Sequence, residues 1–113
     1  MEPRLPAHLE VAALLRQVQA AGGFAAVLQK GERDAGTLLV VCCRNGVQRS
    51  IFERLPSVDG TRAWSLSRTE TLENTAEINQ FLAKRSAQDP DLWVIELDIP
   101  NAERFIGLTG TNG

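Results

Sequence analysis

The chain has few side chains that do chemistry near neutral pH. Among its 113 residues there is one histidine, His8, and the only cysteines, Cys42 and Cys43, are adjacent. A general base must titrate near pH 7, so His8 is the natural candidate, with Arg4 beside it if the first residues fold back. However, His8 falls on the apolar stripe of a predicted helix, where a histidine more often has a structural hydrogen-bond partner. The structural interpretation is therefore preferred.

The pattern of metal ligands argues against a metal site. One histidine and two neighbouring cysteines do not supply the several ligands at suitable spacing that a transition metal needs. Neighbours on a strand point to opposite faces, so Cys42 and Cys43 could form a disulfide only with severe distortion. We expect two reduced thiols in a cytoplasmic protein, with no metal and no cofactor.

The sequence lacks the motifs of common enzyme classes. It contains no phosphate-binding glycine loop, no serine-hydrolase elbow and no dinucleotide fingerprint. The order of elements looks superficially like that of metal-dependent nucleases, which need an Asp on one strand and a Glu-x-Lys on the next. Here Glu53 is followed by Arg54 and Leu55, and Asp34 lies in a loop. The patterns therefore favour a protein that is not an enzyme.

Charge and hydropathy exclude two classes of partner. The net charge is −2 and the basic residues are scattered along the chain, which gives no electrostatic case for nucleic acid. No apolar run is long enough for a membrane span, and the first residues do not resemble a signal peptide. We expect a cytoplasmic protein with no nucleic acid and no membrane as partner.

A hairpin around Asn45 and Gly46 is the clearest structural signal. An Asn-Gly pair between two extended runs predicts a type I′ turn, with Gly46 at φ > 0. Residues 38–43 before it are apolar on both faces, which predicts an interior strand. Residues 24–30 also lack a polar face, so they too are expected inside the sheet.

The remaining elements complete an α+β fold. Residues 6–21 read as a helix, residues 61–68 as an edge strand, and residues 91–98 as a fifth strand. Asn74 to Glu77 matches a capping box and opens a second helix. We predict an N-terminal helix, a four-strand antiparallel meander, a second helix and a fifth strand in one mainly antiparallel sheet, ordered 4-3-2-1-5. Residues 1–106 form a single domain, and residues 107–113 a flexible C-terminal tail.

Apolar strand surface exceeds what two helices can cover if both lie on one side of the sheet. A homodimer is then needed to bury the other face. Trp64, Phe105 and Ile106 are the candidate interface anchors, and Trp64 is also a ligand-binding candidate with Arg4 and His8. We expect a non-catalytic small domain that acts by self-association or by binding an unidentified protein partner. The alternative is a small enzyme or ligand-binding domain with a pocket near Arg4 and His8.

Several segments together resemble a known family. They are Arg4-Leu5-Pro6, His8, the strand at residues 23–30, the glycine-bounded loop at 31–36 and the stretch at 89–96. In combination they resemble small bacterial proteins grouped as domain of unknown function 1491, over nearly the whole chain up to Phe105. The chain departs from that pattern at Glu10, where an aromatic residue would be expected. The resemblance implies a compact α+β domain, and it carries over no activity, cofactor or site residue.

Overall fold

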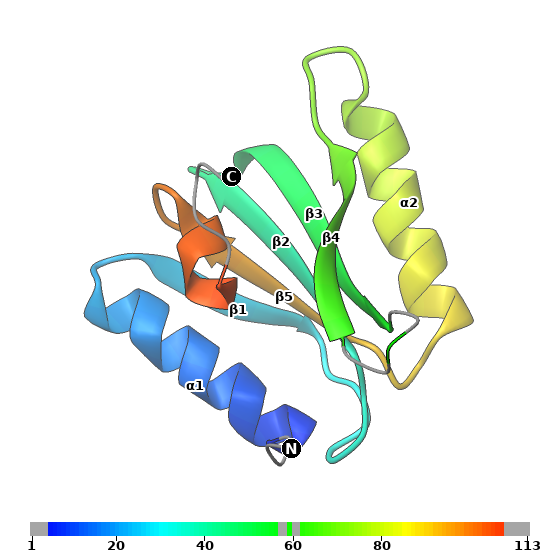
Figure 1. The fold of residues 1–113 in the computed structure, drawn as a ribbon. Helices are drawn as coiled ribbons and strands as arrows, with labels where there is room; N and C mark the ends of the chain where they lie inside the picture. Colours follow the sequence, from blue (N-terminus) through cyan, green and yellow to red (C-terminus); the bar gives the residue numbers. More distant parts are fainter. Residues whose placement is uncertain (1–4, 57–58, 60–61, 108–113) are drawn as a thin grey trace.

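One mixed, mostly antiparallel sheet of five strands organises the chain (Figure 1). A computed structural model describes residues 5–56, 59 and 62–107. The elements are α1 (Ala7–Ala20), β1 (Phe24–Gln29), β2 (Leu38–Arg44), β3 (Val47–Pro56), β4 (Arg62–Thr69), α2 (Thr75–Gln88), β5 (Trp93–Asp98) and the 3₁₀ helix η1 (Ala102–Ile106). The predicted α+β class and order of elements are confirmed. Arg4 and residues 108–113 of the predicted tail lie outside the described residues.

The strand order differs from the predicted one. The sheet runs β1-β5-β2-β3-β4, so β5 lies between β1 and β2, parallel to β2 and antiparallel to β1. The order 4-3-2-1-5 and the interior place of β1 are therefore wrong, and the antiparallel meander is limited to β2, β3 and β4. Large apolar residues on both faces of β5 explain the difference, because β1 offers mainly the small Ala25 and Ala26 for burial.

Each face of the sheet has its own helical cover (Figure 1). Trp93, Ile95 and Leu97 pack with α1 and η1, whereas Val94 packs with α2 on the opposite face, as the alternation in β5 predicts. The argument for a dimer required both helices to lie on one side of the sheet, so it no longer applies. Within the described part of the chain, neither helix is long and apolar enough to cross a membrane.

The predicted turn between β2 and β3 is confirmed. Asn45 has φ 53° and Gly46 has φ 77°, which is the pair of positive φ values that a type I′ turn needs. The register shifts just beyond the turn, where Gln48 also has a positive φ of 56°. This bulge adds one residue to β3 and sets which of its side chains face each helix.

The start of α2 departs from the predicted capping box. Asn74 is the residue before the helix, but its side chain makes no bond to the first turn. Instead, its Oδ1 accepts the Thr71 N–H at 2.7 Å and its Nδ2 donates to the Thr69 carbonyl at 3.0 Å. The side chain therefore closes the loop between β4 and α2.

Candidate functional site

A groove on the α1 face brings together three of the candidate residues. Trp64 from β4 lies with Phe105 and Ile106 from η1 along a cavity of about 330 Å³. Ile106 is buried, and Trp64 and Phe105 are half-buried against the same core. We call this surface the α1 groove. It is lined by Leu5, Glu10, Ala13, Leu14, Gln17, Arg54, Trp64, Phe105 and Ile106.

Arg54 is the central polar group of the α1 groove. Its two Nη atoms donate to the carboxylate of Glu10 at 2.5 and 2.8 Å, and its guanidinium lies 4.9 Å from the centre of the Trp64 ring. The side chain is only 11% exposed. Its Nε is buried and has no hydrogen-bond partner among the described residues. Glu10, which departs from the family pattern, is thus the partner of a nearly buried cation.

A second cavity of about 310 Å³ continues from the α1 groove and shares Leu5, Glu10 and Arg54 with it. His8 does not line this cavity. Its Nδ1 donates to the Arg33 carbonyl at 3.0 Å, and the Asp34 carboxylate lies 4.0 Å away. The side chain of His8, which is one quarter exposed, therefore links α1 to the β1–β2 loop.

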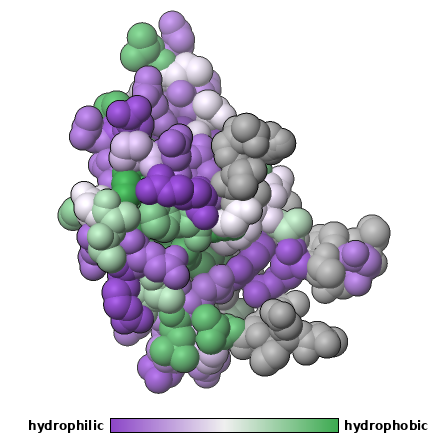
Figure 2. All heavy atoms as spheres, turned by 60° about the vertical axis from the view of Figure 1, so that its left-hand side comes forward, coloured by the Kyte–Doolittle hydropathy of each residue, from purple (hydrophilic) through white to green (hydrophobic). Residues whose placement is uncertain are grey.

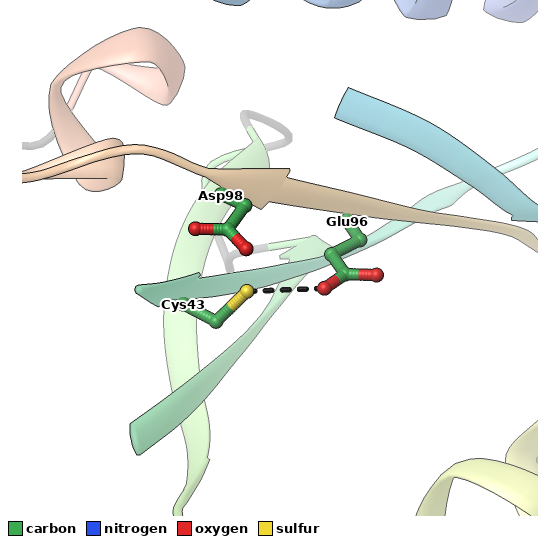
Figure 3. Close-up of side chains that lie close together, drawn as sticks. All are labelled: Cys43, Glu96 and Asp98. Carbon is green, nitrogen blue, oxygen red and sulfur yellow. Dashed lines mark hydrogen bonds between the residues drawn. The ribbon is translucent and has the colours of Figure 1, made fainter. Parts of the chain in front are cut away.

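On the face away from α1, three side chains meet that the sequence analysis did not bring together. Cys43, Glu96 and Asp98 have ligand-type atoms within 4.8 Å of one another (Figure 3). The Cys43 thiol donates to Glu96 at 3.1 Å. Asp98 accepts the Asn45 N–H at 2.7 Å and the Gly46 N–H at 3.0 Å, one on each carboxylate oxygen. The cluster therefore clamps the β2–β3 turn onto β5.

Neither thiol is a nucleophile near neutral pH. Burial, followed by the hydrogen bond to Glu96, raises the pKa of Cys43 to about 12. Burial, with the nearby charge of Glu103, also raises the pKa of Cys42 to about 12. Both thiols are free and buried. A metal at Cys43 would need a thiolate and would compete with the turn for Asp98, so the described contacts support a structural role.

A compact ion pair fastens the end of β4. Arg49 on β3 donates through Nε and Nη2 to the two carboxylate oxygens of Glu70, at 2.9 and 3.0 Å. Their backbones also bond, because the Glu70 N–H donates to the Arg49 carbonyl at 2.7 Å. Hydrogen bonds from the side chain and backbone of Arg49 lower the pKa of Glu70 to about 2. Glu70 is therefore ionised throughout the neutral range.

Sequence signals for these contacts were partial. Alternation along β5 already places Glu96 and Asp98 on the face of Val94. Their meeting with Cys43 depends on the parallel pairing of β2 and β5, for which the sequence carries no local signal. The sequence also carries no local signal for the contact between Glu10 and Arg54, because these residues come from α1 and β3.

Comparisons with known proteins agree with the resemblance seen in the sequence. A family model described as a protein of unknown function, DUF1491, matches residues 5–107. The crystal structure of a DUF1491 family protein from Caulobacter crescentus CB15 has a TM-score of 0.79 at 30% identity, covering 92% of this chain and 96% of that one. An NMR structure of a DUF1491 protein from the same organism has a TM-score of 0.77 at 28% identity, covering 92% and 94%.

A solution structure of a protein from A. tumefaciens is also similar, with a TM-score of 0.68 at 31% identity. That match covers 86% of this chain and 87% of the other. No curated protein matches the chain. The family model spans nearly all the described residues, and the chain therefore belongs to the DUF1491 family of proteins of unknown function.

Proposed function

We propose that this chain is a non-catalytic cytoplasmic domain that binds a segment of a protein partner in the α1 groove. The observation that carries the proposal is the gathering of Trp64, Phe105 and Ile106 around Arg54, a nearly buried cation with an unpartnered Nε. Aromatic and arginine side chains at a hollow in the surface are typical anchors of binding sites. The two free thiols support a reducing compartment.

The groove indicates the chemistry of its occupant. Leu14 and Ile106 supply buried apolar surface that suits an apolar side chain. The Arg104 guanidinium lies 4.5 Å from the centre of the Phe105 ring. No carboxylate among the described residues pairs with Arg104, which bonds only to backbone carbonyls. A partner segment that carries an apolar side chain beside an acidic residue therefore fits the α1 groove best.

The lining argues against catalysis in the groove. Glu10 is its one carboxylate, and both of its oxygens accept hydrogen bonds from Arg54. Within the described lining there is no histidine, cysteine, serine or lysine to act as nucleophile or base. The alternative of a small-ligand pocket near Arg4 and His8 gains no support from the adjoining cavity, because His8 does not line it and Arg4 lies outside the described residues.

Selection from a random peptide display library tests the proposal without a known partner. We expect enriched peptides to carry an apolar residue beside Asp or Glu. Titration of a synthetic peptide should shift the indole N–H resonance of Trp64. The indole of Trp93 is an internal reference, because it donates to the Glu32 carbonyl at 2.7 Å and does not line the groove.

Matched variants locate the binding site. Phe105→Ala should weaken peptide binding by about tenfold, as truncation of a central anchor commonly does. Leu72→Ala removes a side chain that is 97% exposed and lies outside the groove, so it should leave affinity unchanged. Selection of no peptides, or of peptides that bind the Phe105→Ala variant equally well, would contradict the proposal.

A further inference from the structure

The cavity that adjoins the α1 groove, here called the Asp34 cavity, has a chemistry of its own. It has a volume of about 310 Å³ and shares Leu5, Glu10 and Arg54 with the α1 groove, so one occupant can reach from one into the other. Figure 2 brings forward the side of the molecule that carries α1, and hydrophobic atoms reach the surface there between hydrophilic ones. An occupant of both hollows should therefore carry charged as well as apolar groups.

The carboxylate of Asp34 is open to an ionic partner. It is 69% exposed, and within the described part of the chain it accepts no hydrogen bond and has one ion-pair contact, at 4.0 Å to the Nδ1 of His8, which donates to a backbone carbonyl. The other charged groups of the cavity are already engaged: Glu10 binds Arg54 through both oxygens, and Arg62 has an interaction of its own. Electrostatic complementarity therefore favours a basic group in the Asp34 cavity.

The β1–β2 loop holds the backbone of Asp34 in place from several sides. Its carbonyl accepts the Ala7 N–H at 2.9 Å, at the first turn of α1, and its own N–H donates to the Oε1 of Glu32 at 3.2 Å. At Gly36 a Cβ would lie 2.5 Å from the Asp91 carbonyl oxygen, so the loop packs directly on the backbone before β5. The carboxylate thus stands on a fixed backbone, which lowers the cost of ordering it on binding.

We propose that the Asp34 cavity binds a lysine or arginine side chain of the same partner segment whose apolar side chain lies in the α1 groove, with Asp34 as its ionic partner. This inference rests on the function proposed for the α1 groove and specifies the occupant further. The α1 groove extends to Gln17, whereas the Asp34 cavity is lined by the start of α1, so the segment lies along this helix. Its acidic residue is then at the end near Arg104, and its basic residue is on the other side of the apolar one.

Two parallel selections from the random peptide library test the charge preference. Peptides selected on the wild-type chain should carry Lys or Arg on the side of the apolar residue away from the acidic one, and peptides selected on Asp34→Lys should carry Asp or Glu there instead. For one wild-type peptide, Asp34→Asn should weaken binding by roughly three- to fivefold, as expected for an exposed ion pair. It should have no effect on the same peptide with its basic residue replaced by alanine.

Glu73→Gln is the matched control, because it removes one negative charge outside both hollows and should leave affinity unchanged. The indole N–H resonance of Trp93 reports whether the loop is intact in each variant, since this group donates to the Glu32 carbonyl. If Phe105→Ala weakens binding but Asp34→Asn does not, or if the two selections give the same charges, the inference is overturned and the function proposed for the α1 groove stands. A selection that yields no peptide overturns both.

Discussion

Strands β1 and β4 end the same sheet on opposite sides, and different forces hold them in place. Beside its backbone pairing, β4 is held by contacts to charged side chains: Glu70 follows its last residue and forms an ion pair with Arg49 on β3. Ser67 within β4 donates to Glu53 at 2.7 Å. The side chain of Gln29 in β1 is neutral and donates to two backbone carbonyls, at 2.8 and 3.1 Å.

This difference has two consequences. The stability of the β4 edge depends on groups that titrate, so it should respond to pH, whereas that of β1 should not. The charges on β4 also discourage an added strand, because a second copy would bring like charges together. Strand β1 carries no charge, and its pairing with β5 has a bulge between Val27 and Gln29. Substitutions at the two edges should therefore differ in how their effect on stability depends on pH.

The largest effect is expected from Glu70→Gln at the β4 edge. The exposed fractions of the Arg49 and Glu70 side chains are 16% and 8%, so the substitution leaves a mostly buried cation without its partner. Breaking such a pair should lower the free energy of unfolding by about 3 kcal/mol, measured by urea denaturation. Glu73→Gln in the same loop is the control, because Glu73 is exposed and a surface change there should have little effect. Equal losses of unfolding free energy in the two variants would show that the ion pair contributes no more than an exposed carboxylate does.

Acid should affect the same edge. The pKa of Glu70 in the folded chain is about 2, below its ordinary value of 4.5, so the folded state binds the proton less readily than the unfolded state. Its contribution to stability is therefore complete above pH 4.5 and is lost as the pH falls from 4.5 toward 2. Denaturation over this range should show a flatter pH dependence for Glu70→Gln than for the wild type. Parallel curves would mean that other carboxylates cause the acid sensitivity.

A smaller effect is expected from Gln29→Ala at the β1 edge. The change removes two neutral hydrogen bonds to the carbonyls of Asp89 and Leu92, and should lower the free energy of unfolding by about 1.5 kcal/mol. The loss should be the same at pH 3.5 and pH 7, because no titrating group takes part. Gln19→Ala on the exposed side of α1 is the control and should be nearly neutral. A strong pH dependence of the stability loss in Gln29→Ala would contradict the proposed distinction between the two edges.

The sequence was most informative where local pattern decides structure. The turn at Asn45 and Gly46, the two faces of β5 and the ends of α1 follow from positive φ values, alternation and helical spacing. It failed for the place of β1, because a run of five apolar residues, 24–28, predicts an interior strand whether its side chains are large or small. Only the competition with β5 for the middle of the sheet decided the outcome.

The candidate site, too, could be predicted from the sequence only in part. Large apolar side chains that are expected to be exposed often mark a binding surface. On this ground the sequence alone could supply Trp64, Phe105 and Ile106 as candidates. Their meeting in one groove, and the part that Arg54 and Glu10 play there, depend on how α1, β3 and η1 pack. Contacts between elements distant in the sequence leave no local pattern, and this also hid the cluster at Cys43.

The smallest effect is expected from Gly46→Ala, which touches neither edge and serves as a reference for both. Gly46 has φ 77°, and a Cβ built there meets no atom within 4 Å, so only backbone strain opposes the alanine. The free energy of unfolding should fall by about 1 kcal/mol. The turn N–H still reaches Asp98, so the loss should be equal at pH 3.5 and pH 7, unlike that of Glu70→Gln. A neutral effect would mean that the turn relaxes to accept the side chain, and the reference would then have to be taken from another position.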